Sequence, residues 1–452
     1  MTDGGPRIAI IGAGPSGTRA AETLVRHGHR PTVFDESPRS GGQSYRRQPH
    51  GFRRKAQAIY GFEARKAAAV HAAFDAILPM IDYRPDTLVW NIAGRTLFSG
   101  APAEPYAERF DEIIIATGAM DRVLPIPGWT LPGVFSLGGA QVALKYQGCV
   151  VGERPLFVGT GPLLYLVAWQ YLKAGVRPAA VVDTAPFRAK VKATVALGTS
   201  NPAAYCKGLW FYGALRRRGV SVYEGARPIR FIGGARLESM EIAHRGGQVT
   251  IDGDAAGFGF GLSSEAQLAD LAGCRFAWNA AQRQQRPQRD ADFIGAPGIR
   301  LIGDGAAILG ADAAETAGEL AGLLVAEAFG AGIDRARLAT LRRRMRRFER
   351  FQDALATAFP VPASIAAEAP DDCVVCRCEN VTAGEIRDAA RRQDFRDVNH
   401  VKSATRLGMG PCQGRLCGSA AAEIAAAAAK IPPQSAGRLR SQPPIRPIVI
   451  TP

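Results

Sequence analysis

One pattern occurs twice in this chain and constrains its fold more than any other feature. A short apolar stretch leads through a glycine-rich turn into a helical segment, and a second apolar stretch then ends at an acid. The two copies cover residues 7–35 and 155–183. A strand, a crossover helix and a parallel return strand form a βαβ unit, whose crossover is right-handed. The pattern therefore predicts an α/β fold with two dinucleotide-binding, Rossmann-like domains.

The first turn reads Gly12-Ala-Gly14-Pro15-Ser16-Gly17, a GxGxxG sequence between a strand and a helix. In such a turn the first glycine makes the tight bend, the second lets a pyrophosphate approach the backbone, and the third lets helix and strand pack closely. The amides at the helix N-terminus then face the phosphates. Glycine turns also end strands for purely structural reasons, but the complete unit here favours a dinucleotide site.

An acid closes the return strand of this first unit. Asp35 lies 23 residues after Gly12, where a carboxylate accepts a hydrogen bond from a ribose hydroxyl. Glu36 is the neighbouring alternative. We therefore expect one of these two carboxylates to bind the ribose of the nucleotide.

Three later motifs indicate which dinucleotide the first domain binds. They resemble motifs of disulfide-reductase-like flavoproteins, in which two dinucleotide-binding domains occur in one chain. The motifs are Gly42-Gln43 after the first acid, Thr117-Gly118 at the end of an Ile-rich strand, and Gly303-Asp304 at a late strand end. In that group the acid of the last motif bonds the ribityl chain of the flavin. Their order along the chain favours FAD over NAD.

The second glycine turn departs from the first at one position. It reads Gly159-Thr-Gly161-Pro-Leu-Leu164, so that a leucine replaces the third glycine and separates helix from strand. Asp183 ends the return strand and favours a ribose contact. A second adenine nucleotide, such as NAD, and a retained fold with an empty or altered site both remain open.

Cysteines cluster near the C-terminus, where five of the eight fall between residues 373 and 417. Four of them form a C-x-C and a C-x4-C pair: Cys376, Cys378, Cys412 and Cys417. Two such pairs can converge from two turns on one metal centre. Zinc is the alternative, but four thiolates behind a flavoprotein module favour a 2Fe-2S cluster. Cys373 has no assigned role.

The other three cysteines form no pair. Cys149, Cys206 and Cys274 are solitary, and no cysteine precedes Cys149. We expect all three to be buried as small apolar residues. A redox dithiol beside the flavin, as in related disulfide reductases, is therefore not expected.

These motifs divide the chain into four parts. We predict a discontinuous FAD-binding domain, a second dinucleotide-binding-like domain, a small helical iron–sulfur domain and a Pro/Arg-rich extended tail, over residues 1–135 with 285–358, 136–284, 370–430 and 431–452. No apolar stretch is long enough for a spanning helix, and no signal peptide precedes the first strand. We therefore expect a cytoplasmic protein without a membrane span.

The chain is basic, with 56 Lys and Arg against 41 Asp and Glu. The densest basic run, Arg342-Arg-Arg344, lies on a predicted helix at 334–357. Nucleic-acid binding calls for interleaved aromatic residues or a known module, and neither is present. We expect a solvated helix face, and we consider docking of this helix and the tail on partner subunits as the sharper hypothesis.

Taken with these motifs, nearly the whole chain resembles the A (alpha) subunit of bacterial opine oxidases. This family belongs with D-hydroxyproline and dye-linked proline dehydrogenases and with the flavoprotein subunit of hydrogen cyanide synthase. The sharpest match lies in Val375-Cys-Arg-Cys-Glu379 and in residues 406–417, which resemble a bacterioferritin-associated-ferredoxin-like 2Fe-2S domain. Leu164 is tolerated in the family and leaves the second nucleotide unidentified.

The resemblance implies a division of labour between subunits. A separate flavin-containing subunit oxidises the C–N bond of an opine or (D-)amino acid such as hydroxyproline or proline, and this chain carries the electrons through FAD and 2Fe-2S. A small ferredoxin-like subunit is a further candidate partner, and no acid–base catalyst is assigned. The alternatives are a stand-alone NAD(P)H-dependent reductase, a glycine-oxidising subunit of the hydrogen cyanide synthase type, and a zinc-stapled scaffold with a degenerate flavin fold.

Overall fold

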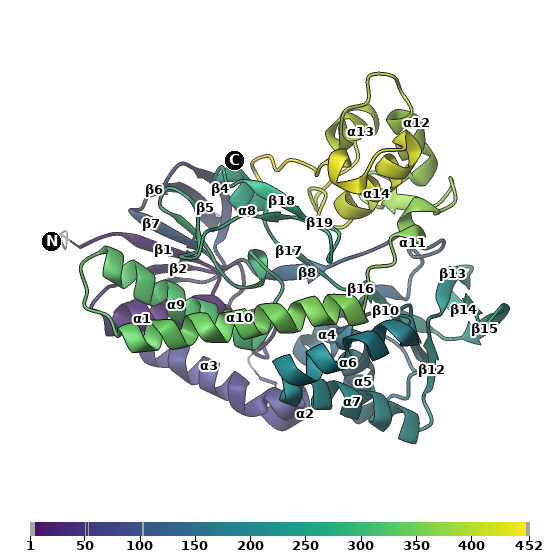
Figure 1. Cartoon of the computed structure of the whole chain (residues 1–452), viewed down its shortest axis with the longest axis horizontal. Coiled ribbons are helices and arrows are strands. Elements are labelled where there is room, and N and C mark those ends of the chain that lie inside the picture. Colours follow the sequence, from purple (N-terminus) through teal and green to yellow (C-terminus); the bar gives the residue numbers. More distant parts are fainter. Residues whose placement is uncertain (1–4, 50, 53, 102–103, 449–452) are drawn as a thin grey trace.

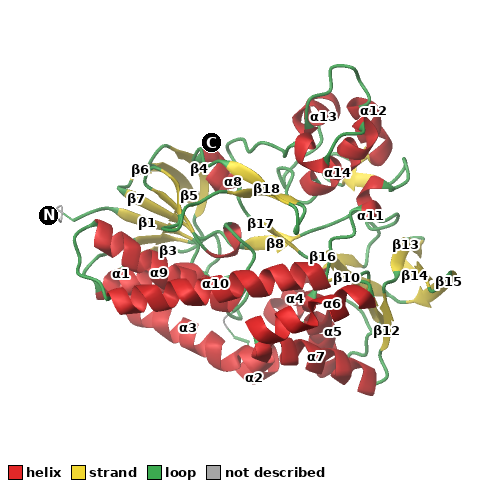
Figure 2. Cartoon of the chain, in the orientation of Figure 1, coloured by secondary structure: helices red, strands yellow, loops and turns green. Residues whose placement is uncertain are grey.

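The computed structural model describes residues 5–49, 51–52, 54–101 and 104–448. Two mainly parallel sheets with helices around them form the body of the molecule, and a small helical domain sits on one side (Figures 1 and 2). The predicted fold class is therefore confirmed. The domain boundaries given above stay a prediction.

The first sheet has the strand order β20-β21-β7-β1-β2-β3. Its strands are β1 (Ile8–Ile11), β2 (Thr32–Phe34), β3 (Asp82–Arg84), β7 (Glu112–Ile115), β20 (Ile294–Ala296) and β21 (Ile299–Leu301). All neighbours are parallel except β20 and β21. The ends of β1, β7 and β21 therefore meet at one edge, and each carries one of the glycine motifs.

Alternation along β1 separates two cores. Ile8 and Ile10 face a helical layer, whereas Ala9 and Ile11 face the opposite side of the sheet. The helical layer consists of α1 (Pro15–Arg26), α3 (Ala64–Ile77), α9 (Ala311–Ala328) and α10 (Arg335–Ala358). The opposite side is covered by α8 (Gln267–Leu271) and by the antiparallel sheet β4 (Leu88–Ala93), β5 (Thr96–Ala101) and β6 (Glu104–Arg109).

The second sheet is wholly parallel and has the order β12-β11-β10-β16-β9. Its strands are β9 (Val134–Ser136), β10 (Pro155–Thr160), β11 (Ala180–Asp183), β12 (Ser221–Glu224) and β16 (Ala255–Phe260). Around it lie α4 (Leu137–Val142), α5 (Pro162–Lys173), α6 (Phe187–Ser200), α7 (Pro202–Arg217) and the antiparallel strands β13 (Arg227–Gly233), β14 (Leu237–His244) and β15 (Gly247–Asp252). Strands β8 (Ala119–Asp121) and β17 (Leu262–Ser264) pair between the two sheets.

The C-terminal domain is built from short elements around two turns. They are α11 (Ser364–Ala367), β22 (Val374–Cys376), β23 (Val381–Thr382), α12 (Ala383–Ala390), α13 (Val398–Thr405) and α14 (Gly418–Ala429). Side chains cap two of these helices: Thr382 and Glu385 form a capping box on α12, and Asp397 caps α13. This domain contacts the body beside the hairpin β18 (Phe276–Asn279) and β19 (Gln284–Pro287).

One expectation is corrected here. Cys274 is buried, but Cys149 and Cys206 are exposed, because they lie at the end of a helix and on an outer helix face. Part of the tail packs on the body: the Ile445 amide donates to the Trp90 carbonyl (3.1 Å), and Ile445 is buried. Docking of the tail on partner subunits stays a prediction. Among the described residues, none of the helices combines the length and apolarity needed to cross a bilayer.

Candidate functional site

The first glycine turn leaves no room for side chains. A Cβ on Gly17 would lie 1.8 Å from the Gly12 carbonyl oxygen, and one on Gly12 would lie 2.5 Å from the Ala116 carbonyl oxygen. Gly12 also has a φ of +106°, which favours glycine. The turn therefore packs tightly against the neighbouring strand end and presents bare backbone to its open side.

A second glycine segment lies against this turn. The Gly41 amide donates to the Ala13 carbonyl (2.8 Å), and a Cβ on Gly42 would lie 2.8 Å from the Gly14 Cα. Gln43 follows and is exposed. The two turns thus face each other across backbone atoms alone, a cradle that suits a pyrophosphate.

The motifs Thr117-Gly118 and Gly303-Asp304 also lie beside the first glycine turn. A Cβ on Gly303 would lie 2.6 Å from the Ser16 hydroxyl oxygen, so the late motif contacts the start of α1. A Cβ on Gly305 would lie 2.8 Å from the Thr117 hydroxyl oxygen. Gly118 has a φ of +75°. Three segments that are distant in sequence therefore converge, as predicted from their positions at strand ends.

The two neighbouring acids have different surroundings. Asp35 is buried, and its oxygens accept from the amides of Ala13 (2.6 Å) and Ser37 (2.7 Å). Burial raises the pKa of Asp35. Glu36 is 42% exposed and pairs only with Arg446 of the tail (2.6 Å) among the described residues. Asp35 therefore stabilises the turn, and Glu36 is the more exposed of the two carboxylates at this strand end.

Asp304 of the late motif has one oxygen in use. Its Oδ1 accepts from the amides of Leu309 (2.8 Å) and Gly310 (3.0 Å), and burial raises its pKa. No partner of Oδ2 is found within the described ranges. Its surroundings therefore fit the predicted role, in which a free carboxylate oxygen meets a hydroxyl-rich ligand.

The four predicted ligand cysteines come together in two pairs. The thiols of Cys376 and Cys417 interact directly, and so do those of Cys378 and Cys412. The contact with Cys417 lowers the pKa of Cys376 to about 5, which favours the thiolate. Cys373 is separate: burial raises its pKa to about 11.

The two thiol pairs lie beside each other. Cys378 also interacts with Cys376, and Cys417 with Cys412, so the four thiols lie close together. Four cysteine thiolates are the ligands of a 2Fe-2S cluster, in which each iron is bound by two of them. The donor set therefore fits a 2Fe-2S cluster.

One loop joins the flavin-type site to the cysteine domain. Thr117 donates its hydroxyl to the Glu265 carbonyl (2.6 Å), and the Glu265 carboxylate pairs with Arg415 (2.5 Å), which lies between Cys412 and Cys417. Both members of this ion pair are nearly buried. The cysteine loop is therefore fixed directly beside the Thr117–Gly118 turn. Sequence reasoning missed this link, since no motif marks Glu265.

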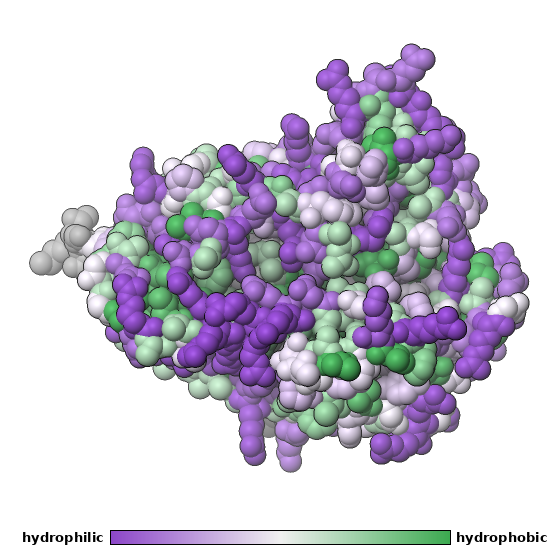
Figure 3. Space-filling model, viewed as in Figure 1, coloured by the Kyte–Doolittle hydropathy of each residue, from purple (hydrophilic) through white to green (hydrophobic). Residues whose placement is uncertain are grey.

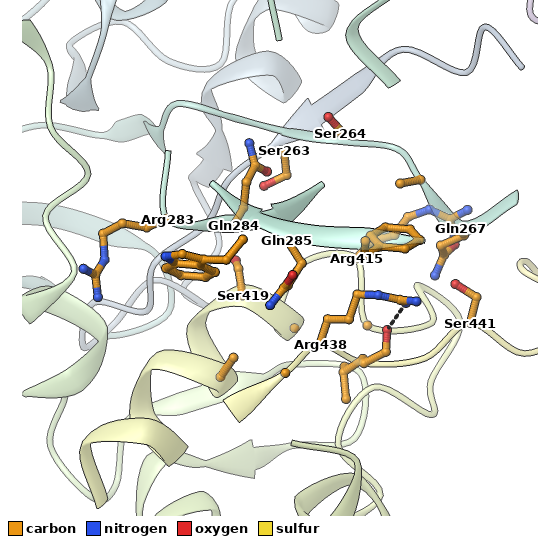
Figure 4. Close-up of a pocket in the computed structure, with 18 of the residues that line it drawn as sticks. Ser263, Ser264, Gln267, Arg283, Gln284, Gln285, Arg415, Ser419, Arg438 and Ser441 are labelled. Atoms are coloured by element: carbon orange, nitrogen blue, oxygen red, sulfur yellow. Dashed lines mark hydrogen bonds between the residues drawn. The ribbon is translucent and has the colours of Figure 1, made fainter. Parts of the chain in front are cut away.

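Further contacts strengthen the same junction. The Gln267 amide group donates to the Gln413 carbonyl (2.8 Å), and the Ser264 hydroxyl donates to the Asp304 carbonyl (2.9 Å). A cleft opens above these residues, as Figure 4 shows, and its polar and aromatic lining includes Ser263, Phe276, Trp278, Gln285, Ser419 and Arg438. The cleft therefore reaches from the surface to the strand that contacts the late motif.

The second glycine turn is arranged differently. Leu164 is fully buried in the apolar core of α5, where the first turn has a glycine. Asp183 is also fully buried, and its Oδ2 accepts from the Tyr165 hydroxyl and pairs with Lys190, both at 2.6 Å. Its Oδ1 accepts from the Ala185 amide (2.9 Å).

These contacts bear on the predicted ribose role of Asp183. Both oxygens are used within the protein, and Lys190 also pairs with Glu224 (2.6 Å). Burial raises the pKa of Asp183, and Lys190 opposes that shift. In this arrangement the carboxylate faces its own domain and not an open nucleotide site, although Gly159 and Gly161 keep the turn itself.

Comparison with known proteins agrees with this geometry. Residues 6–322 match the family described as pyridine nucleotide-disulphide oxidoreductase. The chain belongs to this family. Residues 374–427 match the BFD-like [2Fe-2S] binding domain, so the oxidoreductase carries a second, C-terminal module.

Two curated relatives span nearly the whole oxidoreductase. The A subunit of opine oxidase from Agrobacterium tumefaciens is 35% identical over 98% of this chain and 90% of its own length. Hydrogen cyanide synthase subunit HcnB of Pseudomonas aeruginosa is 32% identical over 91% of this chain and 90% of its own length. Among solved structures, an L-proline dehydrogenase from P. horikoshii has the same fold, with a TM-score of 0.68, 17% identity and coverage of 98% of this chain and 78% of that one.

The two modules therefore define the cofactors of this oxidoreductase as FAD and a 2Fe-2S cluster. The residues present fit both groups. The bare cradle of Gly14 and Gly42 suits the pyrophosphate of FAD, and the two thiol pairs suit the cluster. The resemblance to the A subunits of opine oxidases, drawn from the motifs, is confirmed.

Proposed function

We propose that this chain is the electron-transferring FAD/2Fe-2S subunit of a heteromeric dehydrogenase that oxidises the C–N bond of an opine or (D-)amino acid such as hydroxyproline or proline. The observation that carries the proposal is the junction in which Glu265 contacts both Thr117 and Arg415. It fixes the cysteine loop against the flavin-type site, the arrangement that an internal electron path requires. The likeness to the opine oxidase A subunit supports the substrate class.

In this proposal the residues of the first domain bind FAD. Gly12, Gly14 and Gly17 with Pro15 and Ser16 cradle the pyrophosphate, and Glu36 accepts from the ribose more readily than Asp35 does. The rest of the FAD site is formed by residues of the other three motifs: Gly42, Gln43, Thr117, Gly118, Gly303 and Asp304. Cys376, Cys378, Cys412 and Cys417 hold the cluster. When bound, the two groups supply the redox chemistry, and the protein supplies binding, orientation and electrostatics.

The second domain supports the subunit proposal over a stand-alone NAD(P)H-dependent reductase. A reductase needs a carboxylate or cation that faces the nucleotide ribose, whereas Asp183 is enclosed by Tyr165 and Lys190. We infer that NAD(P)H is not the electron source of this chain. The electrons then come from a separate flavin-containing subunit that binds the amino acid, and a small ferredoxin-like subunit fits as a further partner.

The experiment is co-expression with the flavin-containing subunit, followed by anaerobic mixing with substrates. We expect opines or proline analogues to reduce the FAD of this chain only when the partner is present. A Cys412→Ala variant should keep FAD, lose the cluster and stop electron transfer to an external acceptor. Reduction of the FAD by amino acids without any partner would contradict the proposal.

The likeness to HcnB favours one second candidate, a glycine-oxidising subunit of the hydrogen cyanide synthase type. The same substrate screen distinguishes the two. Glycine turnover with cyanide formation would support the second candidate, and turnover of opines or proline analogues supports the first.

A further inference from the structure

An exposed apolar stripe runs along α6. Phe187, Val191 and Val195 recur at intervals of four residues, and their exposed fractions are 63%, 56% and 76%. On α7, Leu209 and Trp210 are 53% and 38% exposed. Figure 3 shows apolar side chains gathered over the part of the surface where Figure 1 labels α6 and α7. An exposed apolar patch of this kind indicates a contact surface.

The same segment carries charge of one sign. Residues 187–218 contain seven Lys or Arg and no Asp or Glu. Acids of neighbouring elements neutralise two of the seven, because Lys190 pairs with Glu224 and Lys207 pairs with Glu63. No ion pair of Arg188, Lys192, Arg217 or Arg218 is found among the residues described. The apolar stripe therefore has a positive rim.

The long helix α10 extends this positive surface. It packs on α6 through Ala354 and Ala358 against Ala193 and Leu197. Arg347 reaches the Ser200 carbonyl at the end of α6 (3.4 Å). Exposed arginines continue on α10 next to this contact: Arg343, Arg346, Arg347 and Arg350.

The position of this surface limits what can bind to it. In Figure 1 the cysteine domain with α12 to α14 lies at the upper edge of the molecule, and α6 and α7 lie in the lower half of the body, below α10. A protein that exchanges electrons with the cluster must approach the cysteine domain and its junction with the body. Because α6 and α7 lie away from that junction, their surface suits anchoring better than electron transfer.

We propose that α6, α7 and the adjoining face of α10 dock the protein on an anionic lipid bilayer. Aromatic and aliphatic side chains that protrude between Lys and Arg are the composition of helices that lie in a membrane interface. Each basic residue near an anionic surface adds electrostatic attraction. Residues 187–218 carry basic residues and no Asp or Glu, so the charge of this segment is complementary to an anionic lipid surface.

The test is flotation of the full-length, FAD-loaded protein with vesicles. One set contains phosphatidylglycerol and phosphatidylcholine, and the other contains phosphatidylcholine alone. The variants are Phe187→Ser/Val191→Ser/Val195→Ser and Arg188→Glu/Lys192→Glu. Ile294→Ser, which removes an exposed apolar side chain on the far strand β20, is the matched control. Bound FAD and circular dichroism verify that each variant is folded.

We expect the wild-type protein and the control to float with the anionic vesicles only, and less at high salt. Each stripe variant should lower the bound fraction at least about tenfold. The proposal is overturned if the wild-type protein does not float, or if both stripe variants bind like the wild type. It is also overturned if the stripe variants no longer bind a partner subunit and the wild-type protein does not bind the vesicles, because the surface is then a subunit interface.

Discussion

The two glycine turns of this chain start from nearly the same sequence and end in different surroundings. Around the first, bare backbone of Gly14 and Gly42 faces outward, and Glu36 stays accessible behind the buried Asp35. Around the second, Leu164 fills the core, and Asp183 is locked by Tyr165 and Lys190. A Rossmann-type turn can therefore keep its backbone shape although the acid that follows it faces the core of its own domain.

The largest expected effect comes from changing the residue at the third position of each turn. In Gly17→Val the new side chain overlaps the Gly12 carbonyl, so we expect loss of bound FAD and about 3 kcal/mol less stability. In Leu164→Ala a cavity costs a similar amount, about 3 kcal/mol, while FAD stays bound. The measurement is FAD per folded chain with urea unfolding. Retention of FAD in Gly17→Val would remove the contrast between the turns.

The next effect concerns the buried ion pair of the second turn. Lys190→Met leaves the carboxylate of Asp183 buried without its cation, and we expect a loss of about 3 kcal/mol in the free energy of unfolding. Lys192→Met, on the exposed side of the same helix, should change it by less than about 0.5 kcal/mol. Equal stability of the two variants in urea would show that Lys190 is not structural.

A smaller effect should separate the two acids of the first turn. Glu36→Gln should weaken FAD binding roughly tenfold without lowering the stability of the apoprotein, because a charged hydrogen bond to the ribose is lost. Asp35→Asn should instead lower stability by about 1 kcal/mol, because one of the two backbone amides then loses its acceptor. Titration of apoprotein with FAD, followed by flavin fluorescence, checks both. If Asp35→Asn weakens FAD binding and Glu36→Gln does not, Asp35 is the acid that binds the ribose.

The smallest effect is expected at the tail. Arg446 and Glu36 form an ion pair in which both side chains are about 40% exposed. Arg446→Ala should therefore change stability by less than about 1 kcal/mol and FAD affinity by less than about fivefold. Arg440→Ala, whose side chain has no ion pair within the described ranges, is the control. A large loss of FAD in Arg446→Ala alone would make the tail part of the nucleotide site.

Local patterns predicted much of this molecule because they depend on neighbours in sequence. The βαβ units and the basic helix at 335–358 both follow from residues close to one another in sequence. The burial of Cys149 and Cys206 was predicted wrongly, since exposure depends on which helix face the rest of the fold covers.

The junction of the two modules could not be predicted for the same reason. Glu265 and Arg415 are 150 residues apart, and neither lies in a motif that assigns it a partner. Lys190 likewise has an ordinary place on a helix, and only the fold brings it to Asp183. Long-range pairs of charged side chains decide here which acid serves a ligand and which one serves the core.

The most direct test of the difference between the two turns is anaerobic mixing of the purified FAD-loaded chain with NADH or NADPH, followed by the flavin absorbance. We predict that the flavin stays oxidised, because the acid of the second turn is enclosed, and that dithionite still reduces it. Rapid bleaching of the flavin by either nucleotide would show an open second site and contradict the division between the two turns.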